Sequence, residues 1–108
     1  MENRKSLLCE TKSIVAGETE TFCTIYACQY KKTVGLVSSD SAFTFICQQG
    51  HLESAMKWSC SGESELDLVT NKHVLMWDIL QGPAWVSFQV KNTTIDNDDY
   101  TVEAFGEN

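Results

Sequence analysis

The sequence contains a single proline and only six glycines among its 108 residues. Neither residue type gathers into a linker or a low-complexity segment. Long hydrophobic runs are also absent, so the sequence predicts no membrane-spanning helix. The chain length is close to the commonest size of one domain. We therefore expect a single domain over residues 1–108, with one core.

Positive charge is scarce, because eight lysines and arginines are outnumbered by 15 acidic residues, which gives a formal net charge of -7. An acidic surface repels phosphate groups, so we expect neither nucleic acid nor an anionic membrane as a partner. The first residues lack a sustained apolar segment, so no signal peptide is expected. Two interpretations stay open: a protein used without secretion, or a mature ectodomain with an added methionine.

Motifs of catalysis are missing as well. The sequence has no phosphate-binding glycine loop, no nucleophile elbow and no serine–histidine–aspartate spacing. His51 follows Cys47 in a predicted turn, and His73 is distant in sequence, so nothing marks either histidine as the base of a cysteine nucleophile. We therefore expect no enzymatic activity and no cofactor.

Cysteine is comparatively abundant, at Cys9, Cys23, Cys28, Cys47 and Cys60. The odd number leaves at least one cysteine unpaired or bonded to another chain. No Cys-x-x-Cys spacing occurs and most of these cysteines fall inside predicted strands, so buried thiols are expected rather than a zinc site. If a disulfide forms, we expect Cys47 and Cys60 to be the pair, because they end neighbouring alternating strands and share the face of Phe45 and Trp58.

Two acidic clusters could offer oxygen ligands to calcium. Their members are Asp96, Asp98 and Asp99 in one cluster, and Glu63, Glu65 and Asp67 in the other. Neither has the glycine and closing glutamate of an EF-hand, so we expect a hydrogen-bonded corner and a solvated strand face, and no metal. Asn92 begins an Asn-Thr-Thr sequon, which makes it a candidate glycosylation site if the chain is secreted.

Alternation of apolar and polar residues is the main structural signal. It predicts strands at 12–15, 19–29, 33–37, 42–47, 55–60, 66–69, 74–80, 85–91 and 100–105. Turns rich in Gly, Asn, Asp and Ser separate them, so we expect about seven to nine short strands in an all-β sandwich or barrel. A helical turn is considered only at 51–56, and 74–80 is either a central strand or a short buried helix.

Residues 14–22 resemble the first two strands of immunoglobulin-like domains, in which a Gly-Glu turn leads into a long second strand. Cys23 stands where that second strand carries its cysteine, and Trp58 stands where a core tryptophan is expected. Residues 86–100 look like the fifth and sixth strands, with Tyr100 at the tyrosine corner. The chain is thus similar to the immunoglobulin-like superfamily.

The resemblance implies an immunoglobulin-like antiparallel β-sandwich with Cys23, Trp58 and Tyr100 in its core, to which strand alternation adds Phe88. The sequence departs from the family pattern at Val102, where the second core cysteine would stand. The inter-sheet disulfide is therefore not expected. Disulfide-free domains of this shape are similar to those of phage virions, bacterial surface proteins and adhesion receptors.

Two features indicate surfaces for protein partners. Trp85 points opposite to Val86 and Phe88 if its strand alternates, and an exposed tryptophan beside Pro83 and Ala84 would be an interface anchor. The short strands 33–37 and 66–69 are predicted sheet edges, which can recruit a further strand. Val34 and Leu36 on the first of them are interface candidates.

These features favour a non-enzymatic structural module of a virus particle, such as a capsid-decorating protein or a tail or fibre component. It would be assembled in the host cytoplasm and would bind other virion subunits or copies of itself, without inserting into a membrane. The alternative is an immunoglobulin-like receptor or adhesion ectodomain at the cell surface that binds a protein ligand. Disulfide bridges would support the alternative, whereas free thiols in a large assembly would support the virion.

Overall fold

The computed structural model describes residues 4–26, 30–54, 56, 58–80 and 85–107. Every regular element within these ranges is a β-strand, which confirms the predicted all-β class. The nine strands are β1 (Arg4–Ile14), β2 (Thr19–Tyr26), β3 (Lys32–Ser39), β4 (Phe43–Gly50), β5 (Trp58–Glu63), β6 (Glu65–Asp67), β7 (Lys72–Leu80), β8 (Trp85–Asn92) and β9 (Asp98–Glu107). Residues 74–80, for which a helix stayed open, are part of a strand.

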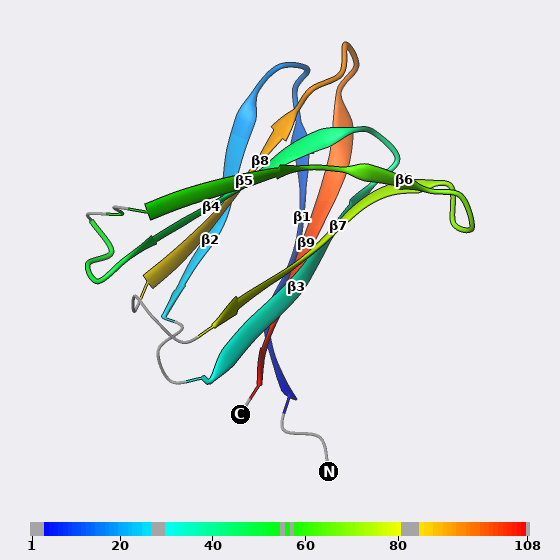
Figure 1. Cartoon of the computed structure of the whole chain (residues 1–108). Helices are drawn as coiled ribbons and strands as arrows, with labels where there is room; N and C mark the ends of the chain where they lie inside the picture. The colour runs from blue at the N-terminus through cyan, green and yellow to red at the C-terminus, as the bar shows by residue number, and fades with distance from the viewer. Residues whose placement is uncertain (1–3, 27–29, 55, 57, 81–84, 108) are drawn as a thin grey trace.

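The strands form two antiparallel sheets, and these pack face to face as a sandwich (Figure 1). The larger sheet has the order β1-β9-β3-β7-β6, and the smaller has the order β2-β8-β4-β5. Four antiparallel pairs are nested in the sequence, from β4–β5 through β3–β7 and β2–β8 to β1–β9, and successive pairs alternate between the sheets. A long hairpin rolled up in this way is a jelly roll.

This strand order differs from that of an immunoglobulin domain. There the first two strands lie side by side in one sheet, whereas β1 and β2 here belong to different sheets. The sandwich of two antiparallel sheets is therefore confirmed. The order in which its strands are connected was not predictable from the sequence pattern. Alternation sets which side of a strand is buried but is silent on which strands are neighbours.

The core lies between the sheets and follows the predicted alternation. Fully or nearly fully buried apolar side chains are Ile14, Phe22, Val37, Phe43, Phe45, Cys47, Val86, Phe88, Val90, Tyr100, Val102 and Ala104. Trp77 of β7 packs against this cluster, with ring centroids 4.7 Å from Phe88 and 5.8 Å from Phe45. Stacked and tilted rings at these separations add specific contacts to the apolar burial.

Gly35 makes room for Trp77 in this core. A Cβ atom on Gly35 would lie 2.2 Å from the Trp77 ring and 2.3 Å from the backbone oxygen of Glu103. Both distances are far below van der Waals contact, so the close approach of β3 to its neighbours requires glycine here.

One of the two predicted edge strands is at an edge, and the other is not. β3 was predicted to be an edge strand, but it lies between β9 and β7 with both sides paired, so that prediction is wrong. The other predicted edge is present at β6, although the strand ends at Asp67 and Val69 lies in the following turn. The edges of the two sheets are therefore β1 and β6 in one, and β2 and β5 in the other.

β1 and β9 pair along almost their whole length, so the two ends of the described chain lie together. Arg4 is the Cα partner of Glu107 in this ladder, and Figure 1 shows the start of β1 and the end of β9 at the same end of the sandwich.

Candidate assembly surfaces

The turns at one end of the sandwich are organised around Asn92, which is fully buried. Its Nδ2 donates to the backbone oxygens of Ile14 at 2.9 Å and Asp96 at 2.8 Å. Its Oδ1 accepts from the backbone N–H of Thr94 at 2.9 Å and from the Thr94 hydroxyl at 2.7 Å. The amide group of Asn92 thus makes its hydrogen bonds inside the fold, and the expected glycosylation site falls on a buried side chain.

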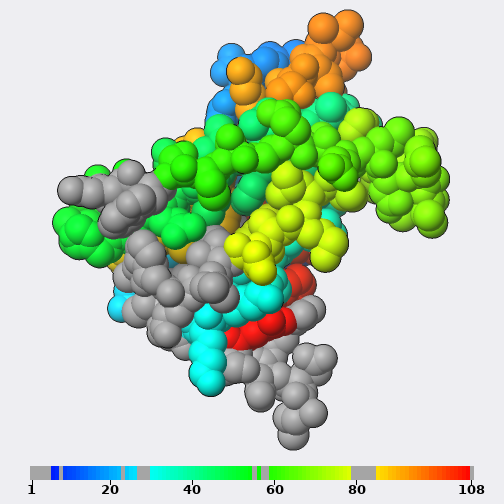
Figure 2. Space-filling model, in the orientation of Figure 1, coloured from blue at the N-terminus to red at the C-terminus, as the bar shows by residue number. Residues whose placement is uncertain are grey.

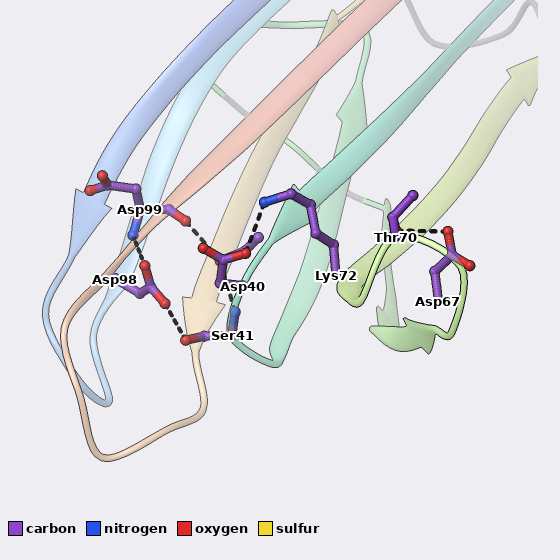
Figure 3. Close-up of polar contacts among 8 residues, drawn as sticks. Asp40, Ser41, Asp67, Thr70, Lys72, Asp98 and Asp99 are labelled. Atoms are coloured by element: carbon purple, nitrogen blue, oxygen red, sulfur yellow. Dashed lines mark hydrogen bonds and ion pairs between the residues drawn. The ribbon is translucent and has the colours of Figure 1, made fainter.

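The acidic cluster near residue 98 is built into the same end. Asp98 accepts hydrogen bonds from the Ser41 hydroxyl and, at 2.8 Å, from the backbone N–H of Asp99. Those donors hold the pKa of Asp98 below its ordinary value. Asp40 accepts a hydrogen bond from Lys72 Nζ at 2.8 Å (Figure 3). These carboxylates tie turns from different strand pairs together.

Tyr100 lies beneath this cluster with its ring fully buried. The ring packs edge-to-face on Phe43, and the hydroxyl donates to the backbone oxygen of Ala42 at 3.4 Å. Burial is the main cause that raises the pKa of Tyr100. The hydroxyl therefore bonds the backbone of the β3–β4 turn, and the side chains of Ser41 and Thr94 also form hydrogen bonds to it.

The second acidic cluster organises the β6–β7 turn. Asp67 accepts from the backbone N–H of Val69 at 3.0 Å and from the Thr70 hydroxyl at 2.8 Å (Figure 3). These bonds lower the pKa of Asp67. Asn71 completes the turn with a φ of 59°, a conformation that asparagine tolerates better than most residues. No group of three or more His, Cys, Asp or Glu residues in the described ranges is placed to hold a metal ion.

The edges of the sandwich carry exposed thiols. β1 and β2 flank one side of the molecule, whereas β5 and β6 flank the other. Cys9 on β1 is exposed, and its Sγ lies 3.8 Å from Oε1 of Glu103 on the outer face of the larger sheet. Cys60 on β5 is also exposed and free. Each side of the sandwich thus combines an open strand edge with a reachable cysteine.

Cys60 has a second cysteine beside it. It stands directly opposite Cys47 in the β4–β5 ladder, and both are free thiols. Cys47 is buried at 3% exposure, and burial is the main cause that raises its pKa to about 12. The expected disulfide partners are therefore neighbours, one inside the core and one in solvent.

The outer face of the larger sheet holds a shallow depression of about 490 Å³. Val34 and Leu36 lie in it together with Met76 and Phe105, and Met76 is 82% exposed. Charged residues border these apolar side chains, including an ion pair of 3.4 Å between Lys32 and Asp78. The two candidates from β3 are thus part of an apolar surface that lies across the middle of the sheet, not along its edge.

The β6–β7 turn projects from the body of the molecule, as the yellow-green segment in Figure 2 shows. Leu68 and Val69 at its tip are 85% and 93% exposed. Exposed apolar side chains on a projection are typical of contact surfaces. Both residues were predicted to lie in the edge strand 66–69, whereas the structure places them in the turn that follows β6. The Asp67–Asn71 spacing of turn-forming residues was the available signal.

The remaining candidate residues from the sequence lie in different environments. Trp85 is half-buried, and its ring packs edge-to-face on Tyr26 with centroids 5.1 Å apart. Pro83 and Ala84, predicted to extend the same patch, lie outside the described residues. Phe88 is fully buried in the core. Cys23 and Trp58 lie in β2 and β5, and their side chains are outside the described part of the structure.

Comparison with known proteins gives the fold and no family. No protein-family model matches this chain, and no curated protein is similar to it in sequence. The pre-peptidase C-terminal domain of a collagenase from Bacillus anthracis has a similar structure, with a TM-score of 0.61 at 14% identity over 90% of this chain and 87% of that one.

A second similar structure is that of Bacillus endospore appendages, described as a novel family of disulfide-linked pili. Its TM-score is 0.51 at 7% identity, over 99% of this chain and 90% of that one. At these identities the likeness is one of fold. Both neighbours are small all-β domains, which agrees with the sandwich.

Proposed function

We propose that this chain is a non-enzymatic structural subunit that assembles with copies of itself, or with other subunits of the same particle, through the open edges of its sheets. The observation that carries this proposal is the exposed free thiol on an edge strand at each side of the sandwich, Cys9 on β1 and Cys60 on β5. Edge strands offer unpaired N–H and C=O groups to a neighbouring strand.

The position of the open edges on two sides of the sandwich supports one kind of assembly. The β5–β6 side of one copy would meet the β1–β2 side of the next, which is a heterologous contact. Heterologous contacts build a ring if the rotation closes and a filament if it does not. A disulfide between an exposed Cys60 and the exposed Cys9 of the next copy would then fix the contact covalently.

Two settings are compatible with such a subunit. One is the virus particle expected from the sequence, where the subunit would decorate a capsid or belong to a tail or fibre. The other is a surface fibre, which is supported by the structural likeness to an appendage described as a disulfide-linked pilus. Electron microscopy of material from the native source separates a capsid-bound subunit from a free fibre.

The alternative function is that of a receptor or adhesion domain at the cell surface, as the immunoglobulin-like resemblance implied, on a sandwich whose strand order is that of a jelly roll. It would use the apolar depression around Val34, Leu36 and Met76 to bind a foreign protein ligand. Such a domain would be monomeric by itself, whereas the structural subunit would associate. None of the described residues forms a helix that could span a lipid bilayer.

The test is the assembly state of the full chain with and without reductant. We expect rings or filaments in negative-stain micrographs, and a ladder of covalent oligomers on a non-reducing gel that disappears with reductant. Cys9→Ser and Cys60→Ser should each remove the ladder, while Cys47→Ser, which changes a buried thiol, should leave it. A chain that stays monomeric at high concentration under both conditions would refute the proposal.

A further inference from the structure

The two cysteines of the β4–β5 ladder are placed for a reaction with each other. Cys47 and Cys60 are direct Cα partners, and side chains of such partners lie on the same face of an antiparallel pair. Directly opposed residues have Cα atoms about 4.5–5.5 Å apart, within the range of about 4.4–6.8 Å that disulfides accept. Both are free thiols in the structure. The register of the ladder therefore places the two cysteines at a separation that a disulfide accepts.

We propose that Cys47 and Cys60 form a redox-controlled pair, whose closure into an intrachain disulfide withdraws Cys60 from bonds between subunits. The second half of this inference rests on the proposed function, whereas the first half does not. The ligand class is a low-molecular-weight disulfide, such as oxidised glutathione. The product is a cross-strand staple that joins the edge strand β5 to the inner strand β4.

The different surroundings of the two sulfurs give the order of events. Cys60 is exposed and meets the oxidant first, whereas Cys47 is buried. The Cys60 thiolate attacks one sulfur of oxidised glutathione, which forms a mixed disulfide and releases one glutathione thiolate. Cys47 then loses its proton and attacks the Cys60 sulfur, which expels the second glutathione. Two protein thiols are oxidised, and one glutathione disulfide is reduced to two thiols.

The second step competes with assembly. Burial holds Cys47 in its neutral form, since its pKa is raised to about 12, and a neutral thiol is a poor nucleophile. A partner subunit that brings an exposed thiol such as Cys9 to the mixed disulfide can therefore react first. A subunit without a partner closes its own pair instead. The pair would thus keep isolated subunits from forming random disulfides.

Disulfide mapping of the full chain tests the first half. Dilute protein is incubated with a mixture of oxidised and reduced glutathione, blocked, digested without reduction and mapped by mass spectrometry. We expect a peptide that links Cys47 to Cys60, formed also in Cys9→Ser and absent in Cys60→Ser. A stable glutathione adduct on Cys60 with Cys47 still reduced would overturn the inference. This readout uses the native chain and does not depend on whether a Cys47 variant folds.

Cross-linking of pretreated protein tests the second half. Chains with the pair already closed are compared with reduced chains for covalent dimers at high concentration. We expect dimers from the reduced chains and only background from the closed ones. Dimers from both would refute the withdrawal of Cys60. Dimers from neither, with Cys47–Cys60 mapped, would refute the proposed function and leave the pair intact.

Discussion

The turn end around Asn92 and the flank formed by β5, β6 and the β6–β7 turn differ in what they expose to solvent. At the turn end, buried Asn92 and Tyr100 have hydrogen-bond partners. Of the large apolar side chains in these turns, Val15 and Ile95 are exposed. On the flank, Leu68 and Val69 face solvent and an edge strand remains open. The first region is thus closed by hydrogen bonds, whereas the second leaves apolar side chains and a strand edge in solvent.

Substitution of Asn92 should have the largest effect on stability. Asn92→Ala removes the acceptor of two Thr94 donors and the donor to two backbone oxygens inside the fold. We expect a loss of about 3 kcal/mol in the free energy of unfolding, because buried groups are left without partners. Chemical denaturation measures it. The exposed neighbour Thr93→Ala is the control and should stay within about 0.5 kcal/mol of the parent.

A methyl group at Gly35 should cost about 2 kcal/mol, since it overpacks a site closed by Trp77 and by backbone. The matched change on the flank is Gly62→Ala. There the nearest atom to the new Cβ is the end of the flexible Leu75 side chain, at 2.9 Å. Thermal unfolding of both variants should give the larger decrease for Gly35→Ala. Equal decreases would mean that the two regions do not differ in packing.

Alkaline pH should destabilise the fold through Cys47. Its pKa is raised from 9.0 to about 12 in the folded chain, so in this range the folded state keeps a proton that the unfolded chain releases. The stabilisation is fully present below pH 9 and is lost as pH rises toward 12. Urea unfolding should therefore show a steeper alkaline decline for the parent than for Cys47→Ala. Parallel curves for the two proteins would contradict the burial of this thiol.

The smallest effect on stability is expected at the tip of the flank. Leu68→Ser and Val69→Ser remove apolar groups that are already in solvent, so the free energy of unfolding should change by less than about 0.5 kcal/mol. If the tip contacts other subunits, the same variants should weaken assembly in analytical ultracentrifugation. A marked loss of stability would instead show that the tip packs against its own chain.

Strands in which apolar and polar residues alternate strongly were predictable from the sequence. Phe43, Phe45 and Cys47 were expected on one face of their strand, and the structure buries all three. The first strand was predicted only from Lys12, whereas β1 begins at Arg4. The ladder shifts register between Ser6 and Leu8, and such an irregularity breaks the two-residue period by which strands are recognised.

The neighbours of each strand were not predictable from the sequence. The location of the candidate assembly surfaces was therefore not predictable either. β3 was expected at an edge because it is short, yet its backbone is paired on both sides. Val34 and Leu36 were therefore chosen as interface residues for a reason that does not hold, although they do lie on the open outer face. Cys60 at an edge strand and Leu68 at a projecting tip depend on strand order and turn geometry, which pairwise spacing in a sequence does not encode.

The pairing of Arg4 with Glu107 has a practical consequence for engineering. Because the two ends sit opposite each other in one ladder, a short loop would join them without distorting either strand. The chain could then be opened elsewhere, for example in the β6–β7 turn, to give a circular permutant with the same two sheets. A cargo fused at the original ends would emerge from one pole, and a cargo at the new ends would emerge from the flank.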